Sequence, residues 1–122
     1  MSMVAIRVMV VEDEALIALQ LTRALTRDGF DVAHPVAAGE EAVVAARTGD
    51  YDVIIMDITL RGAMDGIEAA RAIGAFSGAK IIFTSGHSDD ETMRRVRDFH
   101  SAGFYSKPVD IEELKKTIRR IM

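Results

Sequence analysis

The stretch Val53-Ile54-Ile55-Met56-Asp57 (VIIMD) decides the fold class of this chain, because four large apolar residues in a row are followed by a single acid. An apolar run without alternation is typical of a strand that is covered on both faces, as in a parallel sheet. Open α/β folds bind their ligands at the carboxyl ends of such strands. We therefore expect Asp57 to lie where the chemistry of the protein takes place.

Strand and helix patterns alternate along the whole chain. We predict strands at residues 4–11, 30–33, 53–57, 80–84 and 103–106, and a polar turn at residues 85–88. Amphipathic helices are predicted at residues 15–28, 39–48 and 67–76, with two more that begin near residues 89 and 110. This alternation favours a parallel sheet with right-handed crossovers and helices on both faces. The predicted fold class is α/β, a three-layer (βα)5 doubly wound parallel sheet, and residues 1–122 are expected to form one domain.

Composition excludes several classes of protein. Hydrophobic residues make up 49% of the chain and charged residues 28%, which is typical of a folded domain rather than of a disordered segment. A net charge of −4, without a basic cluster among aromatic residues, argues against a nucleic-acid binder. The chain has no cysteine, and no apolar run approaches the ~20 residues of a membrane span. We expect a cytoplasmic protein that does not bind membranes.

Polar residues follow four of the predicted strands. They are Glu12, Asp13, Asp57, Ser85 and Lys107. Because the ends of parallel strands meet at one edge of a sheet, we expect these side chains to form one site. Three neighbouring carboxylates repel one another and need cations to balance them. Lys107 supplies one positive charge, and a hard divalent cation such as Mg²⁺, which prefers oxygen ligands, would supply two more.

This ordered set of residues resembles a known family, the receiver domains of two-component response regulators, which histidine kinases phosphorylate. The set comprises Glu12-Asp13 after the first strand, Asp57 after the third, Ser85 after the fourth and Lys107-Pro108 after the fifth. Each motif alone is weak, whereas their order and spacing together are specific, and the resemblance covers the whole chain. It implies the flavodoxin-like strand order 2-1-3-4-5.

The resemblance also implies a role for each residue that surrounds the metal. Asp57 corresponds to the phosphoacceptor, and Glu12 and Asp13 correspond to the acidic pair that binds Mg²⁺ together with it. The backbone carbonyl of Thr59 corresponds to a further metal ligand. Since a backbone atom does this work, the identity of the side chain at that position matters little.

Three other residues correspond to the parts of the family that bind the phosphoryl group and respond to it. Ser85 and Lys107 correspond to donors for the phosphoryl oxygens. Phe104, three residues before Lys107, corresponds to an aromatic switch that moves from exposed to buried as Ser85 turns inward. The peptide bond before Pro108 is expected to be cis. Phosphorylation would reshape the surface formed by the fourth helix, the fifth strand and the fifth helix.

The chain departs from the commonest family pattern in three places. Leu60-Arg61 stand where many receivers have Met-Pro, and one extra residue precedes Gly66, so the loop over the site is expected to differ in mobility. Ser85 stands where Thr is commoner, which keeps the hydroxyl and loses the methyl group that restricts χ1. Phe104 lacks the hydroxyl of a Tyr at that position.

The expected function is that of a phosphoprotein in a two-component phosphorelay. A histidine kinase or a phosphotransfer protein would supply the phosphoryl group, and the chain would catalyse only its own phosphorylation and dephosphorylation. A downstream protein or a second copy of the chain would bind the surface formed by the fourth helix, the fifth strand and the fifth helix.

Three alternative functions remain. A degenerate receiver would bind a partner without phosphorylation. A small Mg²⁺-dependent aspartyl-phosphate phosphatase of the haloacid-dehalogenase type would need a second acid two residues after Asp57, where the chain has Thr59. A flavin or nucleotide carrier would need a phosphate-binding loop after the first strand, where the acids Glu12 and Asp13 would repel phosphate.

Overall fold

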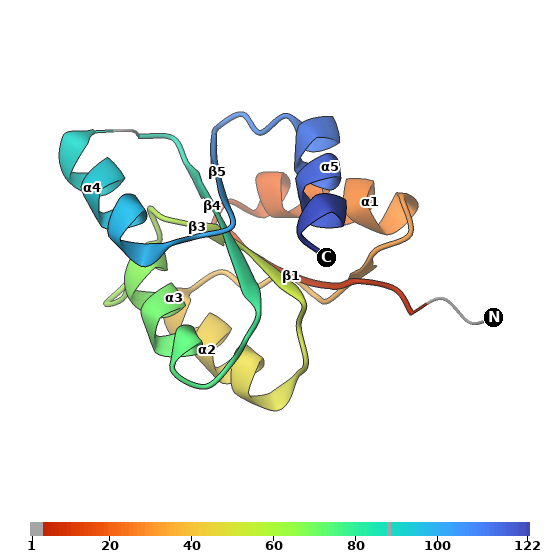
Figure 1. Cartoon of the computed structure of the whole chain (residues 1–122), viewed down its shortest axis with the longest axis horizontal. Helices are drawn as coiled ribbons and strands as arrows, with labels where there is room; N and C mark the ends of the chain where they lie inside the picture. The colour runs from red at the N-terminus through yellow and green to blue at the C-terminus, as the bar shows by residue number, and fades with distance from the viewer. Residues whose placement is uncertain (1–3, 88) are drawn as a thin grey trace.

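A computed structural model describes residues 4–87 and 89–122, which form a three-layer α/β sandwich around a five-stranded parallel sheet of order β2-β1-β3-β4-β5 (Figure 1). The strands are β1 (Arg7–Val11), β2 (Asp31–Val32), β3 (Val53–Asp57), β4 (Lys80–Ser85) and β5 (Gly103–Ser106). The helices are α1 (Ala15–Arg27), α2 (Gly39–Thr48), α3 (Gly66–Gly74), α4 (Asp90–Phe99) and α5 (Ile111–Ile121). The predicted fold class and strand order are confirmed.

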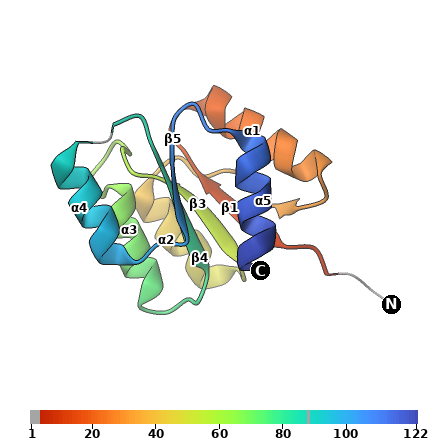
Figure 2. The same ribbon diagram turned by 45° about the horizontal axis from the view of Figure 1, so that its top comes forward.

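Helices cover both faces of the sheet, α1 and α5 on one face and α2, α3 and α4 on the other (Figure 2). The central strand β3 contributes to both layers, because Val53 and Ile55 pack toward α1 and α5 while Ile54 and Met56 pack toward α2, α3 and α4. Every residue of β3 is buried. Successive side chains of a strand point to opposite faces, so a strand covered on both faces has no alternation in its sequence.

Several predicted boundaries differ from the structure, most of them by one or two residues. The first strand begins at Arg7 rather than at residue 4, because the neighbouring strands pair with it only from Arg7 and Val8 onward. Strand β2 has only two residues, and α3 begins at Gly66, where Asp65 and Glu68 form a capping box. Residues 1–3 and Ser88, which belong to the expected domain and to the expected turn at residues 85–88, lie outside the described residues.

Helix α4 is held to the rest of the fold more weakly than its neighbours. Val96 is its only buried residue, and Phe99 meets the Phe83 ring edge-on with a centroid distance of 5.3 Å. An ion pair adds a polar contact, since Arg95 Nη2 lies 2.9 Å from Asp65 Oδ2 at the start of α3. The apolar face of α4 is therefore small. Within the described part of the chain, none of the helices is long and apolar enough to cross a membrane.

The start of α3 lies directly against the end of β3. A Cβ atom at Gly66 would lie 2.0 Å from the backbone oxygen of Asp57 and 2.8 Å from its carbonyl carbon. Backbone atoms of a buried strand cannot move aside as the tip of a flexible side chain can. Gly66 thus permits the close approach that fixes the position of Asp57 relative to the following loop.

Substitution of this glycine tests the close approach. We expect Gly66→Ala to lower the free energy of unfolding by about 1–3 kcal/mol or more, because the added methyl group has no space. Gly74→Ala, at the other end of the same helix, is the matched control, since a Cβ there meets nothing within 4 Å. The control should change stability by less than about 1 kcal/mol. Urea unfolding of both variants measures the difference, and equal stabilities would contradict the interpretation.

Candidate functional site

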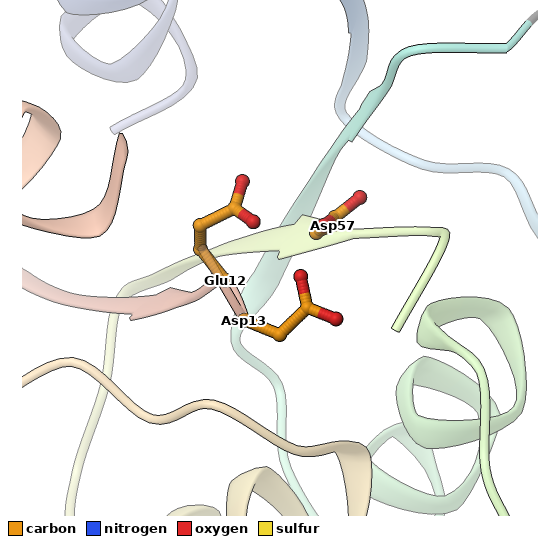
Figure 3. A group of neighbouring side chains, drawn as sticks. All are labelled: Glu12, Asp13 and Asp57. Carbon is orange, nitrogen blue, oxygen red and sulfur yellow. The ribbon is translucent and has the colours of Figure 1, made fainter. Parts of the chain in front are cut away.

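The parallel register of β1 and β3 brings three carboxylates together. Val11 pairs with Met56, so Glu12 and Asp13 follow β1 beside the point where Asp57 ends β3 (Figure 3). One oxygen from each of the three carboxylates lies within 4.8 Å of the others. The sequence prediction that residues far apart in the chain form one acidic cluster is confirmed.

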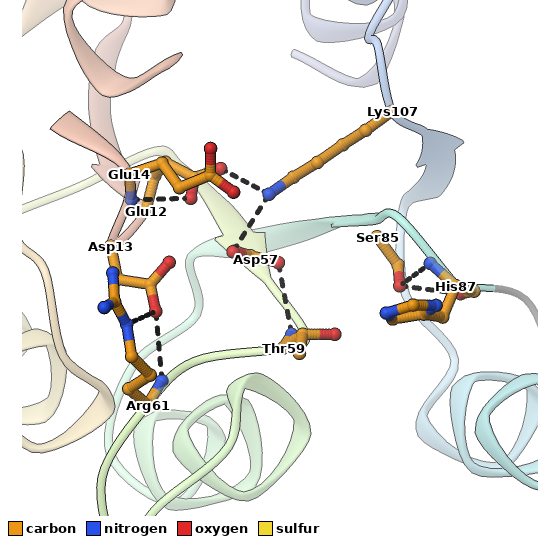
Figure 4. A network of polar contacts seen from close by, with 9 residues as sticks. All are labelled: Glu12, Asp13, Glu14, Asp57, Thr59, Arg61, Ser85, His87 and Lys107. Carbon is orange, nitrogen blue, oxygen red and sulfur yellow. Dashed lines mark hydrogen bonds and ion pairs between the residues drawn. The ribbon is translucent and has the colours of Figure 1, made fainter. Parts of the chain in front are cut away.

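Asp57 is buried, and both of its carboxylate oxygens are bonded. Only 1% of the surface of this residue is exposed. Oδ1 accepts a hydrogen bond of 3.1 Å from the backbone N–H of Thr59, and Oδ2 accepts one of 3.0 Å from Lys107 Nζ (Figure 4). The structure therefore holds the carboxylate in one orientation. The predicted role of the Thr59 carbonyl as a metal ligand stays a prediction.

Lys107 forms ion pairs with two carboxylates at once. Its Nζ lies 2.6 Å from Glu12 Oε1 and 3.0 Å from Asp57 Oδ2, and the peptide bond to Pro108 is cis, as predicted. Burial lowers the pKa of Lys107, but the two ion pairs outweigh burial and hold it above its ordinary value. The lysine is therefore charged at neutral pH and is a permanent cation of the site.

One ammonium group does not balance the carboxylates around it. Burial and the neighbouring charge of Glu12 raise the pKa of Asp57 to about 7, although the hydrogen bond and charge of Lys107 act in the opposite direction. Near neutral pH the Asp57 carboxyl is consequently divided between its protonated and ionised forms. The cluster lacks positive charge.

The donor set fits a divalent cation. Glu12 Oε1 is buried and lies 2.6 Å from Lys107 Nζ, and within the described part of the chain no other donor reaches it. Such an oxygen can accept a hydrogen bond from water carried by a hydrated cation. Carboxylate oxygens, retained water and an excess of negative charge are what Mg²⁺ requires. Glu12, Asp13 and Asp57 are the residues that could hold it.

Asp13 has a partner that the sequence did not reveal. Its Oδ2 accepts two hydrogen bonds of 3.1 Å, one from the backbone N–H of Arg61 and one from Arg61 Nε (Figure 4). Burial raises the pKa of Asp13, but the hydrogen bonds and charge of Arg61 outweigh it and hold the pKa below its ordinary value. The departure at Leu60-Arg61 was visible in the sequence, whereas the path of the loop that brings Arg61 to Asp13 was not.

Ser85 lies at the end of β4, and its hydroxyl is engaged by its own loop. Ser85 Oγ donates a hydrogen bond of 2.6 Å to the backbone oxygen of His87 and accepts one of 3.0 Å from the His87 N–H. The residue is 1% exposed. A cavity of about 130 Å³ opens beside the carboxylates, lined by Asp13, Glu14, Asp57, Thr59, Gly86, His87 and Lys107. Of the five predicted site residues, Ser85 and Asp13 are thus bonded to loop residues, His87 and Arg61, instead of to another member.

The two aromatic residues of β5 lie on opposite faces of the strand. Phe104 is half-buried and packs against the apolar layer under α2, α3 and α4. Tyr105 packs toward α1 and α5, and its hydroxyl hydrogen-bonds to Thr117 and donates to the backbone oxygen of Glu113. Strand β5 therefore links the α4 side of the sheet to α5. The switch role of Phe104 stays a prediction.

Comparison with known proteins agrees with the fold. Residues 8–119 match the family model of the response regulator receiver domain. A curated relative is the transcriptional regulatory protein PdtaR of Mycobacterium tuberculosis, 33% identical over 108 residues, which cover 88% of this chain and 52% of PdtaR. The chain spans about half the length of the curated relatives it matches.

Solved structures give the same result. The signal receiver domain of a modulated diguanylate cyclase from Desulfovibrio desulfuricans G20 superposes with a TM-score of 0.90 at 35% identity, covering 96% of this chain and 93% of that one. A chain from the CheX-CheY-BeF3-Mg complex of Borrelia burgdorferi superposes with a TM-score of 0.85 at 27% identity, covering 95% and 88%.

The chain belongs to the response regulator receiver domain family. Its role is therefore one in two-component signalling. Members of this family interact with kinases or phosphotransfer proteins.

The raised pKa of Asp57 gives a test of the site without metal. The folded state holds the proton up to about pH 7 and the unfolded state only up to about 3.8, so the ionised carboxyl costs stability that grows across this window. In the presence of a chelator, Asp57→Asn should be more stable than the wild type at pH 8 by about 1–3 kcal/mol, and the difference should shrink toward pH 5. Urea unfolding at both pH values measures it. A difference that is independent of pH would show that Asp57 ionises normally.

Proposed function

We propose that the chain accepts a phosphoryl group on Asp57 from the phosphohistidine of a histidine kinase or a phosphotransfer protein. One observation carries the proposal: a buried carboxylate at the end of β3 is oriented by Lys107 and Thr59, stands beside two further acids, and faces a cavity of about 130 Å³. A carboxylate that merely capped a turn would not need a half-buried lysine as its partner.

The proposed reaction is an in-line displacement at phosphorus. An oxygen of the ionised Asp57 carboxylate forms the new P–O bond as the P–N bond to the donor imidazole breaks, and the electron pair of that bond stays on the imidazole nitrogen. Lys107, which already lies 3.0 Å from Asp57, is placed to contact the phosphoryl oxygens. A bound Mg²⁺ would neutralise the charge of the transferring group. Catalysis would come from positioning and from neutralisation of charge. Because the phosphoryl group is accepted by a residue of the chain itself, the chain would catalyse only its own phosphorylation and dephosphorylation.

The proposed response begins at Ser85. A phosphoryl group adds about one negative charge to what the carboxylate already carries and offers new acceptor oxygens. Ser85 would exchange its hydrogen bonds with His87 for one to the phosphoryl group, and Phe104 would follow into the space near Ser85. The surface formed by α4, β5 and α5 would change as a result, because α4 is weakly packed and Tyr105 joins β5 to α5.

The partners follow from this mechanism. The upstream partner is a histidine kinase or a phosphotransfer protein, and the downstream partner is a protein or a second copy of the chain bound to the α4, β5 and α5 surface. We assign residues 1–122 to one receiver domain and the protein to the cytoplasm, where such kinases carry their phosphohistidine. A degenerate receiver that binds without phosphorylation is the alternative, and the complete set of site residues argues against it.

Labelling tests the phosphoacceptor. With Mg²⁺ and a small phosphodonor such as acetyl phosphate, the wild type should gain one phosphoryl group and Asp57→Asn none, because the amide is not nucleophilic. Asp50→Asn, at an exposed aspartate, is the matched control and should label like the wild type. Intact-mass spectrometry measures the gain. Equal labelling of wild type and Asp57→Asn would refute the assignment, and a folded wild type that does not label would favour the degenerate receiver.

A second variant separates phosphorylation from the response. Ser85→Ala should still label, because its hydroxyl does not contact Asp57 before the reaction. Its amide chemical-shift changes in α4, β5 and α5 on adding fluoroberyllate, a phosphoryl mimic, should be less than half those of the wild type. Two-dimensional NMR measures the chemical-shift changes in the variant and in the wild type. Wild-type changes in the variant would show that the hydroxyl does not transmit the response.

A further inference from the structure

Arg61 lies at the site, and the proposed function gives it no role. It lies in the loop between β3 and α3, four residues after Asp57, and its Nε and its backbone N–H both donate to Oδ2 of Asp13 at 3.1 Å. The Arg61 side chain is 81% exposed, whereas the Asp13 side chain is only 12% exposed. An exposed guanidinium that folds over a mostly covered carboxylate is held there by the attraction of the site. It covers one of the three acids that could hold a metal.

The balance of charge shows what this contact does. With all three carboxylates ionised, Lys107 and Arg61 together supply two positive charges against three negative ones, so the site with Arg61 in place is one positive charge short. Arrival of a divalent cation would turn this deficit into an excess of one positive charge. The guanidinium is exposed and, among the residues that the structure describes, its side-chain contact is with Asp13 alone, so it is the group that can leave at least cost. Lys107, held between two buried carboxylates, cannot.

We propose that Arg61 is a built-in counter-ion of Asp13 that competes with the divalent cation and so sets the metal affinity of this receiver domain. The inference rests on the proposed function, since it takes the acidic cluster to be the metal site. It makes Arg61 a positioning residue that acts through Asp13 and has no contact with the phosphoryl group. Metal binding would release the guanidinium and, with it, the hydrogen bond from the Arg61 N–H to the same oxygen.

Removal of the charge tests the competition. Isothermal titration calorimetry of Mg²⁺ into the full chain at about 0.15 M salt should give a dissociation constant about three- to tenfold lower for Arg61→Gln than for the wild type, because an exposed charge acts through a screened field. Arg61→Lys, which keeps the charge, should stay within about twofold of the wild type. Arg47→Gln is the matched control, since Arg47 stacks over the Phe76 ring in the last turn of α2 and its loss changes the net charge by the same amount.

A second measurement follows Arg61 itself. On titration of the wild type with Mg²⁺, the backbone amide signal of Arg61 should shift and its hydrogen exchange should accelerate at least fivefold, because its acceptor is taken by the cation. This change needs no phosphoryl donor and no activity.

The outcomes are distinct. A higher affinity in Arg61→Gln, with Arg61→Lys and Arg47→Gln near the wild type and a released Arg61 amide, supports the proposal. An unchanged or weaker affinity in Arg61→Gln overturns it, and the weaker affinity would mean that Arg61 orients Asp13 for the metal. An equal gain in Arg61→Lys or Arg47→Gln also overturns it, because the effect would not be that of a charge at this place. Failure of every variant to bind Mg²⁺ would overturn the metal site itself together with the inference.

Discussion

The ammonium of Lys107, shared between the buried carboxylates of Glu12 and Asp57, is the interaction on which the site depends. It joins the ends of three strands, although β5 lies at the edge of the sheet and β4 separates it from β3. The long side chain of a lysine spans this distance, and its cation offsets part of the cost of burying two carboxylates. Loss of the lysine alone would leave two buried acids without a cation between them.

The sequence predicted the sheet and most of the site because both follow from simple regularities. An unbroken apolar run such as residues 53–56 belongs in a strand covered on both faces, and an acid directly after it must then lie at the carboxyl edge. The position of Lys107 followed in the same way once five βα units were counted. Strand ends are fixed by the pairing of the sheet, so residues attached to them can be placed without knowledge of any loop.

The sequence could not predict what the loops do. The Asp13–Arg61 contact depends on the backbone path between β3 and α3, which no periodic pattern describes. The hydrogen bonds of Ser85 with His87 have the same origin, because the acceptor is a backbone oxygen whose direction is set by the turn after β4. The start of the first strand was predicted wrongly for a related reason. The partner strands, rather than the apolar run itself, decide that β1 begins at Arg7.

The difference between rigid strand ends and loops also bears on how metal binding and phosphorylation are proposed to be linked. Asp57 is held in place, because Gly66 packs against its backbone and two donors bond its side chain, so we expect the reactivity of Asp57 to depend on the charge around it rather than on its own movement. Burial and Glu12 raise the pKa of Asp57 to about 7, which leaves part of the population protonated and unable to attack phosphorus. A divalent cation beside the cluster would favour the ionised, nucleophilic form. Because Arg61 competes for Asp13 in our proposal, the metal concentration at which Asp57 becomes reactive would be set by a residue in a loop rather than by the rigid edge of the sheet.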